Sequence, residues 1–394
     1  MKKQILSALL FIAAILVPGS LPAQQPEKVY SIVKEVQSFD WYQAQAKAWK
    51  SVLDKDPNNG PGWIYYYTAN RMARLTDRSR WEAARGEYFK NLSDIVNMAG
   101  KAMPGSYESI YIKLYNNSID YPDYEKDLFR AYELSGGKAE ILDEVVLWYE
   151  VKRNGEKRRE FNKKWFLSND IAPGILNYNY NVLKTLDDDA IILTAGDNDT
   201  FPLWMLQDAL GLKPGVAVLN IPLLAKEDYR KKIFGELQIP EIQFNADNYK
   251  DPDSLSALRK VILSQVIEKS KRPVYLALTL DTKYYLDADI QKDLYLSGLA
   301  MRYQKKEFDN LGVIRRHFEN DYLLDYLKVA FASDPSAAVV AQMNTGYLPS
   351  LVKLCSHYRS SGESEKLAKV RELIATISAK SGRVEEIKEY NDCE

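Results

Sequence analysis

Three short apolar runs, each separated from the next by a helix-like pattern, constrain the fold of this chain more than any other feature. The runs are Ala190–Thr194, Val216–Asn220 and Val274–Leu280, and their aliphatic composition is typical of buried strands. Strands that alternate with helices favour a parallel sheet with right-handed crossovers. We therefore expect a small parallel, Rossmann-like α/β domain over residues 171–319.

Helical patterns flank this domain on both sides. Val29, Ile32, Val33 and Val36 recur at the spacing of one helix face, and Asp40 is expected to cap the next helix. Further helices are expected over Arg80–Met98, Tyr107–Asn117, Asp123–Leu134, Lys138–Arg153, Leu203–Leu210, Glu227–Glu236, Leu255–Lys269, Leu294–Lys305, Asn320–Ala332 and, as a pair turned at Gly362, Pro349–Ser378.

The order of helix, turn and helix in these flanking regions resembles that of tetratricopeptide hairpins. A Pro- and Gly-rich turn over residues 54–63 separates two helices, and Tyr347-Leu348-Pro349 precedes the later pair. The 34-residue repeat of that family is not kept cleanly, so the resemblance is partial. We expect a helical, tetratricopeptide-like domain over residues 24–170 and a C-terminal helical region over residues 320–394.

The first residues have the pattern of a secretory signal. Lys2 and Lys3 precede the apolar stretch Ile5–Val17, and Ala23 offers a small residue at a cleavage site. A helix over this stretch would cover roughly 20 Å, short of the ~30 Å hydrocarbon core of a bilayer. The sequence therefore predicts a cleaved signal peptide over residues 1–23, no transmembrane span in the mature chain, and a periplasmic or otherwise exported location.

Composition excludes several function classes. The formal net charge of -1 gives no basic excess for nucleic acid. The two cysteines, Cys355 and Cys393, lack metal-ligand spacing; whether they form a disulfide stays open. Of the two histidines, His317 follows two arginines and is expected to be surface charge. The 27 tyrosines fit either a packed helical core or a stacking surface for sugars.

The polar segment Gly196-Asp197-Asn198-Asp199-Thr200 leaves the first expected strand and starts a helix. Ligands of open α/β sheets bind at the carboxyl ends of strands, so these five residues are the candidate ligand-binding site. Gly196 permits close backbone approach, and Asp197 and Asp199 are hard oxygen ligands that suit a divalent cation such as Mg²⁺. No cofactor is required by the pattern.

The loop has three open interpretations. Asp197 and Asp199 fit an Asp-x-Asp glycosyltransferase motif, or a phosphatase motif in which Thr200 comes one place early. Alternatively, Asp199 or Thr200 caps the helix and the loop is structural. Weaker ligand-binding candidates lie just upstream, in a polar-aromatic stretch that also fits an ordinary helix: Asn177, Tyr178 and Asn179.

The stretch Leu176–Leu224 resembles the extracytoplasmic region of bacterial membrane proteins that are related to protein O-mannosyltransferases and to animal transmembrane protein 260. Gly196–Trp204 matches that family throughout, whereas Asp208 stands where Glu is usual and Gly215 where Asp is usual. The second part of the family pattern is matched by Gln207, Gly211, Pro214, Val216, Asn220, Leu223 and Leu224, and a later segment by Tyr295–Gln304.

This resemblance implies the fold of the α/β domain but not a reaction. Sugar transfer in that family is assigned to a multi-pass membrane region, and this chain has none. We therefore expect an exported, non-catalytic binding or scaffold protein of the cell envelope that recognises a glycan, a peptide or a protein partner. The alternatives are a metal-dependent enzyme that uses Asp197 and Asp199 on a glycan or phosphoester, and a structural assembly factor without a small ligand.

Overall fold

The computed structural model describes residues 25–77, 79, 84–242, 252–329 and 334–382. The expected signal peptide and Cys393 lie outside these residues, whereas Cys355 is buried in the C-terminal helices. None of the helices in the described part of the chain is both long and apolar enough to cross a membrane.

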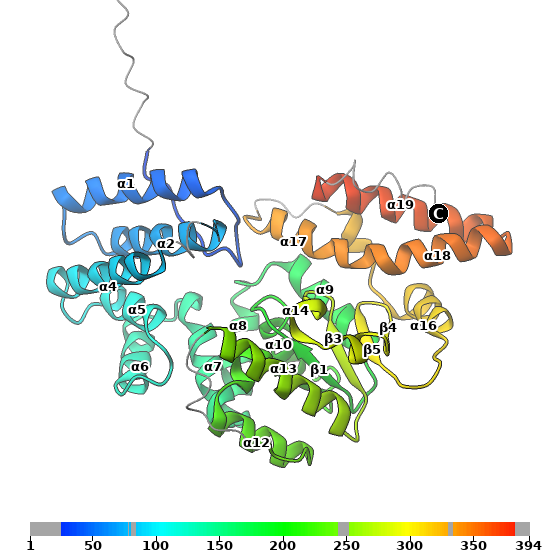
Figure 1. The fold of residues 1–394 in the computed structure, drawn as a ribbon. Helices are drawn as coiled ribbons and strands as arrows, with labels where there is room; N and C mark the ends of the chain where they lie inside the picture. The colour runs from blue at the N-terminus through cyan, green and yellow to red at the C-terminus, as the bar shows by residue number, and fades with distance from the viewer. Residues whose placement is uncertain (1–24, 78, 80–83, 243–251, 330–333, 383–394) are drawn as a thin grey trace, which may run out of the picture.

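The N-terminal half is helical and forms the upper left and lower left of Figure 1. Most of the expected helices are present, with boundaries shifted by a few residues. They are α1 (Phe39–Lys55), α2 (Gly60–Thr76), α4 (Arg85–Ala102), α5 (Tyr107–Asn116), α6 (Tyr124–Leu134), α7 (Leu142–Lys152), α8 (Gly155–Leu167) and α9 (Pro173–Thr185).

The chain ahead of α1 is not the helix that its spacing predicts. Residues 25–37, which we name the N-terminal strap, are irregular apart from a turn at residues 32–34. Val29 is buried and Val36 is exposed, so the apolar residues do not share one face. Ser38, rather than Asp40, caps α1, because its hydroxyl accepts a hydrogen bond from the Trp41 N–H at 3.1 Å.

The sheet is mixed, not purely parallel, with the strand order β2-β1-β3-β5-β4. The three expected strands are present and pair in parallel, with Ile191 opposite both Ala217 and Val274. β5 and β4 are antiparallel to them. The strand bounds are β1 (Ile191–Thr194), β2 (Ala217–Asn220), β3 (Val274–Ala277), β4 (Leu294–Leu296) and β5 (Ala300–Tyr303).

β4 and β5 replace the helix that the sequence predicts over Leu294–Lys305. The two strands are joined by a tight turn in which Gly298 has a φ of 84°, a conformation that glycine adopts without strain. The Ser297 N–H donates to the Ala300 carbonyl oxygen at 2.8 Å and closes this turn. A three-residue hairpin loop with a left-handed glycine is a common connection between antiparallel strands.

The remaining helices cover the sheet and extend the chain to the upper right of Figure 1. Gly362, with a φ of 74°, ends α18 and turns the chain into α19, as the sequence predicts. The helices are α10 (Phe201–Leu210), α11 (Ile221–Leu224), α12 (Glu227–Leu237), α13 (Pro252–Lys269), α14 (Thr282–Tyr285), α15 (Ala288–Gln291), α16 (Asn310–Arg316), α17 (Ala337–Asn344), α18 (Leu348–Ser361) and α19 (Ser364–Ser381).

The helix expected over Asn320–Ala332 is not formed in its described part, which has only short turns of non-α helix. His317, expected at the surface, is buried, because its ring stacks on Tyr322 and its Nδ1 lies 2.9 Å from Asp321 Oδ2. One continuous cluster of buried apolar side chains runs from Tyr107 to Ile377. Residues from both sides of positions 170 and 319 contribute to this cluster.

Candidate functional site

The two carboxylates of the Gly-Asp-Asn-Asp-Thr loop point in different directions. Asp199 is buried and faces inward, where its oxygens accept hydrogen bonds from the Gly196 N–H at 2.8 Å and the Ala195 N–H at 3.4 Å. The hydroxyls of Thr279 and Thr200 donate to the same carboxylate. Burial raises the pKa of Asp199, and these bonds oppose the rise. Asp199 therefore holds the loop in shape.

The side chain of Thr200 also lies in the interior, although Thr200 is the N-cap residue of α10. Its hydroxyl is 2.7 Å from the Thr194 hydroxyl and accepts a hydrogen bond from Asn220 Nδ2 at 3.1 Å. No side chain caps α10; instead, the Asp197 carbonyl oxygen accepts from the Phe201 N–H at 3.0 Å. Thr200 therefore occupies the N-cap position of α10 as expected, but neither its side chain nor that of Asp199 makes the capping hydrogen bond.

Asparagines connect the loop to the elements on either side of it. Asn179, fully buried in α9, donates through Nδ2 to the Asn198 carbonyl oxygen at 2.8 Å. Asn198 in turn donates through Nδ2 to the Val33 carbonyl oxygen of the N-terminal strap at 2.8 Å. Of the upstream candidates, Asn177 bonds within α9, and Tyr178 is buried against Tyr347.

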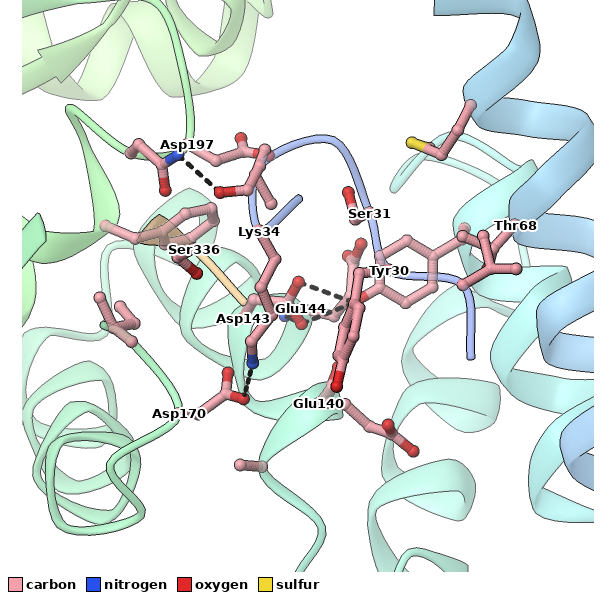
Figure 2. A pocket seen from close by; sticks show the side chains of 18 of the residues that line it. Tyr30, Ser31, Lys34, Thr68, Glu140, Asp143, Glu144, Asp170, Asp197 and Ser336 are labelled. Carbon is pink, nitrogen blue, oxygen red and sulfur yellow. Dashed lines mark hydrogen bonds and ion pairs between the residues drawn. The ribbon is translucent and has the colours of Figure 1, made fainter. Parts of the chain in front are cut away.

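A cavity of about 400 Å³ lies between the strap, the helical half and the loop. Asp197 and Asn198 line it, whereas Gly196, Asp199, Thr200 and the three upstream candidates do not. Figure 2 shows Asp197 from the loop, Lys34 and Tyr30 from the strap, and Asp143 and Glu144 from α7 around this space. The loop is thus one wall of a site whose other walls come from distant parts of the sequence.

Aromatic rings form much of the opposite wall. Tyr111 and Tyr115 lie one turn apart on α5, with their ring centroids 4.6 Å apart. Ring faces of this kind can cover the apolar faces of a ligand. The aromatic residues that line the cavity are Tyr30, Tyr65, Tyr67, Tyr111, Tyr115, Trp165 and Phe201.

Acidic side chains from the start of α7 face the same space. Asp143 accepts hydrogen bonds from the Tyr115 hydroxyl at 2.7 Å, and Glu144 accepts one from the Tyr124 hydroxyl. Burial and the neighbouring Glu144 raise the pKa of Asp143 well above its usual range, with a further contribution from Asp197. Burial also raises the pKa values of Glu144 and Asp197, and both rises are opposed by Arg71.

Arg71 and Asp197 line the cavity without direct partners. Within the described residues, neither the Arg71 guanidinium nor the Asp197 carboxylate makes a hydrogen bond or an ion pair. The Arg71 guanidinium lies over the Tyr115 ring, 5.5 Å from its centroid. By contrast, Lys34 of the strap is paired with Asp170 at 2.6 Å. The Arg71 guanidinium and the Asp197 carboxylate can therefore serve a ligand as donor and acceptor, respectively.

The sequence reasoning missed most of these cavity residues. Two patterns were available to it: Tyr107, Tyr111 and Tyr115 recur every four residues on one helix face, and Asp143 and Glu144 lie at three and four residues after Glu140. Both patterns place polar groups on a single helical stripe. Nothing in the sequence, however, indicates that these stripes face the loop after β1.

The raised pKa of Asp143 predicts a stability change that depends on pH. The pKa of Asp143 is higher in the folded state than in the unfolded state, where it is near 3.8. The free energy of unfolding therefore falls as pH rises from the unfolded-state pKa to the folded-state pKa. We expect Asp143→Asn to raise the melting temperature at pH 7 by about 2 °C, a change of about 1 kcal/mol, and by less at pH 4.5. Differential scanning calorimetry of both proteins at the two pH values measures this.

The exposed Asp123 provides the matched control for that measurement. Asp123→Asn removes a carboxylate outside the cavity and is expected to change the melting temperature equally at both pH values. An Asp143→Asn shift of the same size at pH 7 and pH 4.5 would show that ionisation of this carboxyl does not oppose folding.

A shared metal site for Asp197 and Asp199 has no geometric basis in this arrangement, because the Asp199 oxygens are engaged by donors. Within the described part of the chain, no group of three or more His, Cys, Asp or Glu side chains is arranged to hold a metal ion. Asp197 instead lines the aromatic cavity, as do Arg71 and several tyrosines.

Comparison with known families identifies one segment of the chain. Residues 175–252 match the sequence model of the family described as TMEM260-associated domain 2. This match includes β1, the Gly-Asp-Asn-Asp-Thr loop and β2, covers less than half of the chain, and supports a relation to TMEM260 proteins. Comparisons with curated proteins and with solved structures gave no significant match.

Proposed function

We propose that this protein is an exported, non-catalytic binding protein of the cell envelope, and that its cavity takes a short, neutral glycan. The single observation that carries this proposal is that Arg71 and Asp197, neither of which has an ion-pair partner among the described residues, line the cavity beside several tyrosine rings. A sugar hydroxyl can donate to a carboxylate and accept from a guanidinium at once, while the sugar's C–H face packs on an aromatic ring.

The balance of charge in the cavity favours a neutral ligand. Burial raises the pKa values of Asp143, Glu144 and Asp197, because a buried site disfavours the charged form of a carboxyl group. The lining residues also mix the two signs: the cations are Lys28, Lys34 and Arg71, and the acids are Glu140, Asp143, Glu144, Asp170 and Asp197. Such mixed polar groups among aromatic rings fix the orientation of a polar ligand.

The kinship of the Gly196–Trp204 segment supports the same function. We infer that the chain is a relative of the extracytoplasmic region of O-mannosyltransferase-like proteins, with tetratricopeptide-like helices beside it. We expect such an extracytoplasmic region to bind a glycan without transferring it. A metal-dependent enzyme using Asp197 and Asp199 would need both carboxylates on one ion, and Asp199 is engaged within its own loop.

A glycan array tests the proposal directly. The purified chain without residues 1–23 is expected to bind a subset of neutral oligosaccharides above the level of charged ones, and isothermal titration calorimetry should then give a stoichiometry of one. Absence of binding to every neutral glycan, or equal binding by a variant in which Tyr115 and Asp197 are both replaced by alanine, would contradict it.

A further inference from the structure

A second, separate groove of about 830 Å³ lies on the outer helices, lined by residues from α4, α5 and α6 and the loops between them. It shares no lining residue with the cavity described above. Its charged lining residues are mostly cations, whereas those of the aromatic cavity are mostly acids. The two sites therefore select ligands of different chemistry.

Cationic side chains dominate this groove. Lys101, Lys113, Lys126 and Arg130 line it, against the single acid Asp127. Asp127 is already engaged, since its Oδ2 accepts from Lys113 Nζ at 2.6 Å and from the Tyr121 hydroxyl. Within the described residues, Lys101 and Lys126 have no ion pair. The groove thus presents uncompensated positive charge that is open to solvent.

The floor of the groove is open because it is built from small residues. Gly100 and Gly105 line it, and a Cβ atom added at either would meet no heavy atom within 4 Å. Ser93 and Ser109 also line the groove. Primary amides surround this floor and can both donate to and accept from a peptide backbone: Asn97, Asn116 and Asn117.

We propose that this groove binds a short acidic segment of a partner protein. Carboxylate side chains of the segment would pair with Lys101 and Lys126, and its backbone would bond the asparagine amides beside the two glycines. Arg130 also lines the groove but is already paired with Glu133 at 3.3 Å. The open floor lets an extended main chain approach closely, which a wall of larger side chains would prevent.

The surroundings of the groove favour a short peptide over a long polyanion. Exposed acids lie on the same helices, among them Asp94 on α4 and Glu125 and Glu133 on α6. A nucleic acid or a long anionic glycan that continued beyond the groove would meet these like charges. A segment with a few carboxylates fits within the cationic stretch.

Fluorescence anisotropy with a labelled hexaglutamate peptide tests this inference. We expect hexaglutamate to bind, hexaglutamine not to bind, and the affinity to fall as NaCl rises from 50 to 300 mM. The double variant Lys101→Glu/Lys126→Glu should weaken binding about tenfold or more, because two attractive charges become repulsive. Both side chains are exposed, so the fold should be unaffected.

The double variant Lys47→Glu/Lys163→Glu is the matched control, since it makes the same change in net charge at exposed sites outside the groove. It should bind hexaglutamate as the unmodified protein does, and so should Asp197→Asn, which alters only the first cavity. Equal loss in the control, equal binding of hexaglutamine, or tighter binding of a DNA oligonucleotide than of the peptide would overturn the proposal.

Discussion

Asp199→Ala is expected to lower the free energy of unfolding by about 3 kcal/mol, the largest stability loss that we predict for this loop. The substitution removes the acceptor of two backbone N–H groups, those of Gly196 and Ala195, and of two threonine hydroxyls. Leaving buried donors unsatisfied costs about 1–3 kcal/mol for each group that cannot reach water. Urea denaturation monitored by tryptophan fluorescence measures the change.

Asp189→Ala is the control for this experiment, because Asp189 is an exposed carboxylate in the turn just before β1. We expect its effect to stay within about 0.5 kcal/mol, as is usual for surface substitutions. A loss of less than about 1 kcal/mol for Asp199→Ala would mean that the loop keeps its shape without this carboxylate. The buried Asp199 side chain would then not stabilise the loop.

Replacement of either unpaired cavity group is expected to weaken glycan binding by between about tenfold and a hundredfold. Arg71→Met keeps an apolar side chain but removes the guanidinium that lies over the Tyr115 ring, and Asp197→Asn keeps the shape but removes the charge. Hydrogen bonds to charged groups contribute about 1.5–3 kcal/mol, which corresponds to this range of affinities. Isothermal titration calorimetry with the glycan selected on the array gives both values.

The groove variant Lys101→Glu/Lys126→Glu serves as the control for these titrations, because it lies outside the cavity. It should retain the glycan affinity of the unmodified protein, and circular dichroism should show that all four proteins are folded. Unchanged affinity in both Arg71→Met and Asp197→Asn would contradict the assignment of these groups to a glycan.

The interior strands of the sheet could be predicted from the sequence, whereas its edge could not. The four residues of β1 are all buried, as expected for a strand covered on both faces. β4 and β5 have intermediate burial, and their mixed pattern fits a helix as well as a hairpin. The turn residue Gly298 was the signal that distinguishes the two, since a helix interior disfavours glycine.

For the candidate site, the sequence predicts the place of the loop but not the directions of its side chains. The position of the loop after β1 follows from the strand–helix order, and Asp197 and Asn198 do line a cavity. The direction of each side chain does not follow from that order, so Asp199 and Thr200 could not be placed inside. Arg71 and Asp143 line the same cavity as the loop because of how α2 and α7 pack. No short sequence pattern predicts that packing.

Hydrogen–deuterium exchange with and without the selected glycan tests the central claim most directly. If a ligand lies between the N-terminal strap and the loop, the backbone amides of residues 28–34 and 196–199 should exchange more slowly when it is bound, while those of α18 and α19 stay unchanged. Protection confined to other parts of the chain, with no change in these two segments at saturating glycan, would contradict the account.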